Sequence, residues 1–97
     1  MKILAISEDL QPIDWQMQSD TLVSEAHKLH ELYLSGDIRE FYFTEDGDAV
    51  LILECISMQE AERLLQQLPL VHQGLIGFKL MALNPYNGFQ RLFGQGV

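Results

Sequence analysis

The sequence predicts an α+β fold in which strands and helices follow one another in the order βαββαβ. The first observation is that the hydrophobic period alternates along the chain between two, which is typical of strands, and 3.6, which is typical of helices. The second is that two helical stretches of comparable length each cross between predicted strands. This order is the ferredoxin-like, or split βαβ, arrangement, in which a four-stranded antiparallel sheet carries both helices on one face.

The N-terminal part begins with a short strand, a loop and a helix. Residues 2–7 are rich in Ile and Leu and precede a polar stretch that contains a proline, as expected for a strand followed by a loop. Asp20 offers an N-cap and Gly36 a C-terminal cap, so a helix is predicted between them. Its apolar stripe consists of Leu22, Ala26, Leu29 and Tyr33, with Val23 and His30 beside it.

A β-hairpin is predicted next. Residues 38–44 and 48–55 are rich in β-branched and aromatic side chains. Asp46 and Gly47 suit a two-residue type I′ turn, because both central positions of that turn need a positive φ.

This turn sets an expected register. It places Phe41 opposite Ile52 and Arg39 opposite Glu54, so that unlike charges meet. Both faces of the hairpin are then apolar. One face carries Phe41, Phe43, Val50 and Ile52, and the other carries Ile38, Tyr42, Leu51 and Leu53.

The C-terminal part predicts a helix, a strand and a tail. Residues 57–60 form a capping box, and the helix that follows ends at Pro69. Residues 75–83 are predicted to form the last strand, and the turn-rich residues 84–88 lead into the tail. The stripe of this helix is Met58, Ala61, Leu64, Leu65 and Leu68, and the apolar residues of the tail are Phe89, Leu92 and Phe93.

Length and composition narrow the classes of function. Residues 1–97 are expected to form a single domain. The net charge is −8 and the basic residues are not clustered, so no nucleic-acid partner is expected. The longest apolar run, residues 49–53, is far shorter than the ~20 residues that span a bilayer, so no membrane partner is expected. The single Cys55 fits a reducing compartment, and we expect a cytoplasmic protein.

The apolar hairpin predicts self-association. Two helices can cover only one face of the sheet, and a monomer would leave the other apolar face in water. A second copy packed sheet to sheet would cover it and form a dimeric α+β barrel. We expect the tail, residues 84–97, to pack on the partner subunit. The alternative is that the tail folds back over the open face of its own sheet.

The end of the second predicted helix carries a family resemblance. Residues 65–70, Leu-Gln-Gln-Leu-Pro-Leu, are similar to a Leu-x-Gln-Leu-Pro-Leu motif, and Gly36, Arg39 and Glu54 add support. From the first strand to about Pro85 the sequence resembles muconolactone isomerase and the small dimeric α+β barrel proteins related to it. The resemblance implies the fold, pairing into barrels and, for the isomerase, larger rings of such pairs.

The sequence also departs from that family. Where we expect the isomerase to carry a histidine and a further basic residue on the second strand, this chain has Glu40 and Phe43. Residues 84–89 replace a basic tail. Muconolactone carries a carboxylate, which calls for Arg, Lys or helix N-terminal amides nearby. We therefore do not expect muconolactone itself to be the substrate.

Two classes of function are compatible with these observations. The first is a cofactor-free isomerase or lactone-handling enzyme that moves a proton next to a carbonyl in a small organic molecule. The second is a non-catalytic module that binds a small ligand or only assembles. An enzyme of the first class needs at least two ionisable groups close together in a pocket.

The candidate catalytic residues are Arg39, Glu40 and Glu54. Arg39 would anchor an anionic or carbonyl oxygen, and Glu40 or Glu54 would move the proton. The simpler interpretations are an ion pair of Arg39 with Glu54 at the strand ends and a solvated Glu40. Tyr42, on the same predicted face as Glu40, is a candidate for substrate binding.

Histidines supply the remaining candidates. His30 and His72 are candidates for substrate binding, although a hydrogen-bonded core histidine and a loop residue explain them more simply. The spacing of His27 and His30 alone does not make a metal site, so no metal and no cofactor are expected. Glu25 lies at the border of the first helical stripe, where the resemblance also places an acidic residue, but a solvated helix flank explains it equally well.

Overall fold

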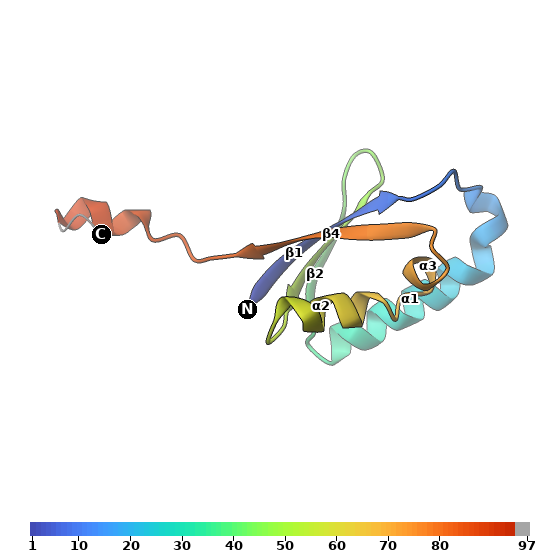
Figure 1. Cartoon of the computed structure of the whole chain (residues 1–97), viewed down its shortest axis with the longest axis horizontal. Coiled ribbons are helices and arrows are strands. Elements are labelled where there is room, and N and C mark those ends of the chain that lie inside the picture. The colour runs from blue at the N-terminus through green and yellow to red at the C-terminus, as the bar shows by residue number, and fades with distance from the viewer. Residues whose placement is uncertain (95–97) are drawn as a thin grey trace.

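The computed structural model describes residues 1–94 and confirms the predicted βαββαβ order (Figure 1). All strand pairs are antiparallel, and the sheet order is β2-β3-β1-β4. Short elements that were not predicted are two 3₁₀ helices and one extra helical turn after Pro69. The strands are β1 (Lys2–Asp9), β2 (Ile38–Phe43), β3 (Ala49–Glu54) and β4 (Ile76–Leu83), and the helices are η1 (Trp15–Gln18), α1 (Ser19–Leu34), α2 (Met58–Leu65), α3 (Pro69–His72) and η2 (Gly88–Phe93).

Both long helices pack on the same face of the sheet, as Figure 1 shows. The core lies between this face and the helices, and its most buried side chains come from alternate positions of the strands. Its members include Ile3 and Ala5 of β1, Leu51 and Leu53 of β3, and Leu32, Ala61, Leu64 and Leu65 of the two helices.

The hairpin turn is one residue longer than predicted. The Thr44 amide donates to the Asp48 carbonyl at 2.8 Å and the Gly47 amide donates to the Thr44 carbonyl at 2.9 Å, so Glu45, Asp46 and Gly47 make up the turn. In residues 1–94 all positive φ values belong to glycines, and the φ of Gly47 is 87°. A three-residue hairpin loop of this kind places a left-handed glycine at its last position, so Asp46 needs no positive φ.

The predicted register is therefore wrong by one residue. Phe41 lies opposite Leu51 and Tyr42 opposite Val50, whereas we expected Phe41 opposite Ile52. Because successive side chains of a strand point to opposite faces, this shift moves Phe41 to the helix side of the sheet and leaves Tyr42 on the other side with Val50.

A bulge at Arg39 changes the register again near the start of β2. Glu40 lies opposite Ile52 but Ile38 lies opposite Leu53, so Arg39 is the extra residue. Without it, Ile38 would fall on the open face. With it, Ile38 is fully buried in the core and Arg39 has no cross-strand partner, so the predicted pair of Arg39 with Glu54 does not form.

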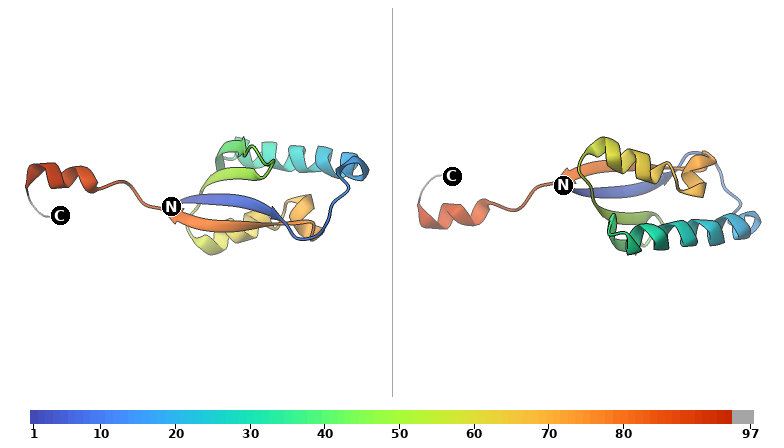
Figure 2. Two further views of the ribbon diagram at one scale, coloured as in Figure 1. Left: turned by 90° about the horizontal axis from the view of Figure 1, so that it is seen from above. Right: turned by 90° about the horizontal axis from the view of Figure 1, so that it is seen from below.

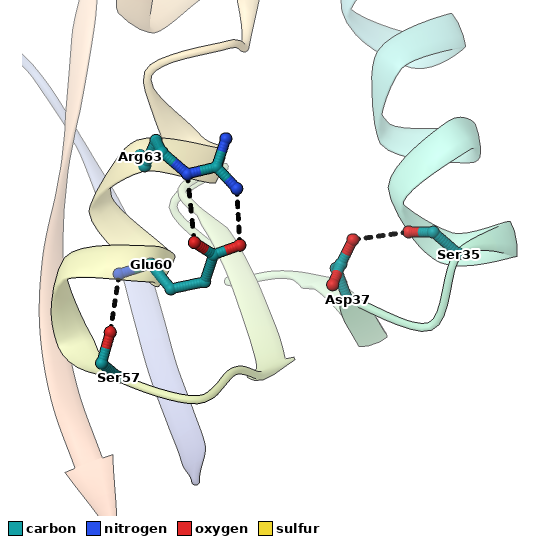
Figure 3. A network of polar contacts seen from close by, with 5 residues as sticks. All are labelled: Ser35, Asp37, Ser57, Glu60 and Arg63. Atoms are coloured by element: carbon teal, nitrogen blue, oxygen red, sulfur yellow. Dashed lines mark hydrogen bonds and ion pairs between the residues drawn. The ribbon is translucent and has the colours of Figure 1, made fainter.

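The two long helices differ in how well the sequence predicted them. In α2 the capping box is confirmed, since the Glu60 amide donates to the Ser57 hydroxyl at 3.1 Å, and Arg63 binds the Glu60 carboxylate (Figure 3). Four residues of the predicted α2 stripe, Ala61, Leu64, Leu65 and Leu68, are buried, and the fifth, Met58, is half-buried. In α1 the buried residues are Glu25 and Leu32, and the predicted stripe faces the core only in part.

The C-terminal tail leaves the body of the protein. After β4 the chain extends as an arm that ends in η2, away from the sheet and the helices (Figures 1 and 2). The alternative in which the tail folds back over its own sheet is therefore wrong for the described residues. The side chains of Phe89, Leu92 and Phe93 are between 67% and 79% exposed.

Candidate functional site

A cavity of about 530 Å³ lies between α1 and the helix-facing side of the sheet. It opens near the end where β1 finishes, β4 begins and the hairpin turns, and η1 and α3 contribute one residue each. Its walls are largely apolar. They include Trp15, Leu22, Leu29, Phe43, Leu51 and Phe78.

Glu25 is the buried carboxyl group of this cavity. Only 7% of the residue is exposed, and its Oε1 accepts a hydrogen bond from the Leu70 amide at 3.0 Å. The structure gives Oε2 no hydrogen-bond partner among residues 1–94, so this oxygen is free to bind a ligand in the cavity. Desolvation by burial raises the pKa of Glu25, and the hydrogen bond from Leu70 opposes this effect less strongly.

Leu70 can bind Glu25 because of the proline that precedes it. Pro69 is the first residue of α3, where a proline is favoured because the first amide of a helix has no partner within the helix. The next amide, that of Leu70, also lacks a partner within the helix and points to Glu25. The sequence that ends α2 thus holds the carboxyl group of α1 in place.

Ser7 supplies a hydroxyl group to the same cavity. It is 8% exposed, and its Oγ accepts a hydrogen bond from the Ala49 amide at 2.7 Å. Because this bond uses a lone pair of the hydroxyl oxygen, the hydroxyl hydrogen remains available for a ligand. Glu25 and Ser7 therefore offer the cavity a proton-transfer group and a hydrogen-bond donor.

The charged residues that line the cavity are all acidic. Besides Glu25 they are Asp9 at the end of β1 and Asp46 and Asp48 at the hairpin turn. No Lys, Arg or His from the described part of the chain lines this cavity.

The predicted catalytic residues lie elsewhere and are not close together. The Arg39 Nε donates to the Gly36 carbonyl at 2.6 Å, on the surface at the end of α1. The Glu54 carboxylate is 3.9 Å from the N-terminal amine, at the opposite end of β3 from the cavity. Neither residue lines the cavity that contains Glu25.

Glu40 and Tyr42 are brought together, but on the open face of the sheet. The Tyr42 hydroxyl donates to Glu40 Oε1 at 2.7 Å, and both residues are exposed. This hydrogen bond, with the nearby negative charge, raises the pKa of Tyr42.

The two candidate histidines are both exposed. His30 lines a shallow depression between α1 and β2, where Tyr33 and Phe41 pack edge to face with their ring centroids 5.7 Å apart. The interpretation of His30 as a core histidine is therefore wrong. His72 ends α3 and is not part of the cavity lining.

Sequence reasoning noted Glu25 but did not select it. Glu25, Leu29 and Leu32 are spaced i, i+4 and i+7, which places them on one helix face. A stripe drawn through this face would have included the carboxyl group. The stripe drawn through Leu22 and Tyr33 has more apolar residues, and it left Glu25 at its border.

Within residues 1–94, no three His, Cys, Asp or Glu side chains are grouped so that they could hold a metal ion. No helix of the described chain has the length and apolar character needed to cross a membrane.

Comparison with known proteins identifies the fold. Neither a scan against models of protein families nor a search of curated proteins found a match. Among solved structures, muconolactone isomerase superposes with a TM-score of 0.75 and 16% identity, over 90% of this chain and 92% of the isomerase chain. The chain has the muconolactone isomerase fold.

A second structure supports the same conclusion. It is 5-chloro-2-hydroxyhydroquinone dehydrochlorinase from Burkholderia phenoliruptrix AC1100, solved in complex with 2,5-dihydroxybenzoquinone. The TM-score is 0.65 at 18% identity, over 89% of this chain and 97% of the dehydrochlorinase chain. The resemblance predicted from the sequence is thus confirmed at the level of the muconolactone isomerase fold.

Proposed function

We propose that this protein is a cofactor-free enzyme of the muconolactone isomerase type, which moves a proton next to a carbonyl in a small cyclic molecule. The observation that carries the proposal is Glu25, a buried carboxyl group with one oxygen facing a largely apolar cavity. A volume of about 530 Å³ is within the range of pockets that hold small organic ligands.

The cavity residues fit a proton shift. The Glu25 carboxylate would take a proton from the carbon next to the carbonyl, and the electron pair of that C–H bond would form an enolate. The Ser7 hydroxyl would donate a hydrogen bond to the enolate oxygen. Protonated Glu25 would return the proton to another carbon of the conjugated system, so that the double bond moves and no proton is gained or lost.

The environment of Glu25 suits this role. Burial raises its pKa, and a carboxylate whose pKa is closer to the working pH is a stronger base. The Leu70 amide fixes Oε1, so Oε2 is the oxygen that would take the proton.

The structural neighbours give the proposal context. One is an isomerase named for a lactone, and the other is a dehydrochlorinase solved with a hydroxylated quinone. For this chain, a small oxygenated ring is the proposed substrate class. The free thiol of buried Cys55 is compatible with a reducing, cytoplasmic location.

The candidates predicted from the sequence define a second possible location for the chemistry. Glu40 and Tyr42 form a hydrogen-bonded pair on the open sheet face, which a second copy of the chain would cover. There Glu40 would move the proton, with Arg39 and Glu54 near the ends of the two strands. This alternative and the cavity can be separated by two conservative variants.

The experiment compares Glu25→Gln with Glu40→Gln. Each protein is incubated with a panel of unsaturated lactones in deuterated water, and deuterium uptake at the carbons that lose and gain the proton is measured by NMR. Glu25→Gln should slow the uptake by about 10²–10⁴-fold, because the amide accepts the Leu70 hydrogen bond but cannot take a proton. Glu40→Gln and Arg39→Ala should leave the rate within about twofold.

The opposite result would reject the cavity. If Glu40→Gln or Arg39→Ala abolishes uptake while Glu25→Gln does not, the chemistry takes place on the open face. If the unmodified protein binds lactones without any uptake, the non-catalytic binding module is the better description.

We propose further that the protein is a homodimer whose subunits pack through the open faces of their sheets. This face carries an apolar set from all four strands, only partly shielded within one chain. Covering about 800 Å² per copy would match an interface of standard size. The set includes Leu4, Ile6, Tyr42, Val50, Ile52 and Met81.

The arm is the second part of the proposed interface. Phe89, Leu92 and Phe93 are largely exposed in η2, and the ring of Tyr86 packs edge to face on that of Phe89. Deleting residues 89–97 should raise the dimer dissociation constant at least 10-fold in sedimentation experiments and should weaken the dimer more than it destabilises the fold of the monomer. Tyr42→Glu is the matched change on the sheet face, and it should also separate the subunits. A monomer of about 11 kDa for the unmodified chain at micromolar concentration would reject the dimer.

A further inference from the structure

The charges around the cavity determine which small rings it can bind. An inference about this selectivity rests on the proposed function, because it concerns the substrate of the same site. Asp9, Asp46 and Asp48 are placed around a mostly apolar cavity with Glu25 inside it. Among the lining residues that the structure describes, none carries a positive charge.

A carboxylate bound in this cavity would have no group to neutralise it. Carboxylate ligands in proteins are bound by arginine, by lysine or by the free amides of a helix N-terminus. The Leu70 amide, near the start of α3, already donates to Glu25. A negative ligand would also lose its water shell in the cavity and lie close to carboxylates of the protein.

A cationic ligand is also disfavoured. The walls in contact with a ligand are mainly apolar and aromatic, and a cation would lose its water shell against them. The deepest carboxyl group, Glu25, is in surroundings that disfavour its charged form.

We infer that the cavity selects uncharged oxygenated rings and rejects rings that carry a carboxylate. The arrangement that supports this is a largely apolar cavity with one buried carboxyl group, a hydroxyl hydrogen on Ser7 that is available to a ligand, and no cation among its described lining residues. The selectivity differs from what muconolactone, itself a carboxylate, would require. An uncharged unsaturated lactone is the substrate class that the charges fit.

The test uses two probes that differ in charge and by one methyl group, muconolactone and its methyl ester. Trp15, the single tryptophan of the chain, lines the cavity, so the change in its fluorescence reports binding without any need for turnover. At pH 7.5 the unmodified protein should bind the ester at least 10-fold more tightly than the acid. Deuterium uptake into each probe is measured in parallel.

The variant Asp9→Asn/Asp48→Asn tests the electrostatic cause. It removes two negative charges at the cavity and keeps the size of both side chains, so the preference for the ester should fall at least threefold. The thermal melt and circular dichroism of the variant serve as the folding control. An unchanged preference in a folded variant would overturn the electrostatic explanation.

The outcomes separate this inference from the proposed function. Tighter ester binding without deuterium uptake supports the selectivity and rejects the enzyme. Equal or tighter binding of the acid overturns the selectivity, with or without uptake, and would indicate a cation supplied by a second copy, such as Arg91 of its arm. If neither probe changes the fluorescence of Trp15, the inference is overturned as well.

Discussion

The helices α1 and α2 lie on the same face of the sheet, but α2 packs against it more tightly than α1 does. In α2, Ala61, Leu64 and Leu65 are buried and the space beneath them is filled. In α1, which is twice as long, only Glu25 and Leu32 are buried, and the cavity lies beneath its N-terminal half. The tightly packed half of the face supplies stability, and the loosely packed half contains the candidate site.

The apolar residues of α1 explain the difference. They spread over a wide arc of the helix, from Leu32 through Leu29 and Leu22 to Tyr33 and Val23. A helix can rest on the sheet through only part of so wide an arc. The face that packs on the sheet includes Glu25, and the end of the arc with Tyr33 and Val23 stays largely exposed.

The strongest test of this comparison is a pair of leucine truncations. Leu65→Ala removes a side chain that is 3% exposed from the filled half, and it should lower the free energy of unfolding by about 2–5 kcal/mol. Leu22→Ala, at a residue that is 39% exposed and lines the cavity, should cost less than about 1 kcal/mol. Chemical denaturation measures both. Equal losses would show that α1 and α2 pack alike.

A smaller effect is expected at the helix N-termini. Ser57→Ala removes the side-chain cap of α2 and should cost about 1 kcal/mol. Gln18, at the equivalent position of α1, makes no capping hydrogen bond through its side chain, so Gln18→Ala should have no measurable effect. The same denaturation experiment compares the two, and a loss at Gln18 as large as that at Ser57 would contradict the comparison.

The smallest effect concerns the pH dependence of stability. Because burial raises the folded-state pKa of Glu25, its contribution to stability is fully present below the unfolded value of 4.5 and is lost as the pH rises through the folded value. Glu25→Gln keeps the hydrogen-bond acceptor without the charge. Its melting temperature relative to the unmodified protein should therefore rise between pH 4.5 and 8, by about 5 °C or less.

Glu62→Gln is the control for this measurement, because it removes one negative charge from the exposed side of α2. If Glu25→Gln and Glu62→Gln give the same profile, burial of Glu25 has no consequence for stability. If Glu25→Gln is less stable at pH 8 than the unmodified protein, the ionised carboxylate stabilises the fold.

The fold was predictable because most local signals agree with one another. The Ser57 capping box, Pro69 and the α2 stripe all point to the same helix, and the structure confirms it. The hairpin was placed correctly, but its register was not, because Asp46–Gly47 fits both a two-residue and a three-residue turn. The two turns differ in whether Phe41 and Phe43 or Tyr42 share the core face with Leu51, and the local sequence does not show which of these side chains the core accommodates.

The candidate site was harder to predict, because it depends on which groups share a cavity. Arg39 was expected to face Glu54, and the bulge separates them. Glu25 meets Leu70 across 45 positions of the sequence, and no local pattern indicates this contact. The charged residues that the sequence pattern favoured, Arg39 and Glu54, are therefore on the surface. The buried Glu25 has the sequence pattern of an ordinary solvated helix flank.

The bulge at Arg39 indicates where gaps belong when the sequences of proteins with this fold are aligned. Deleting the codon for Arg39 would leave Ile38 next to Glu40, and their partners Leu53 and Ile52 are already adjacent, so the ladder would become regular. Every other side chain of β2 would keep its face. A one-codon gap at this position therefore preserves the core, whereas a gap placed at Phe41 would exchange the two faces of the sheet for all residues on one side of it. Alignments of distant relatives should place their gap at the bulge.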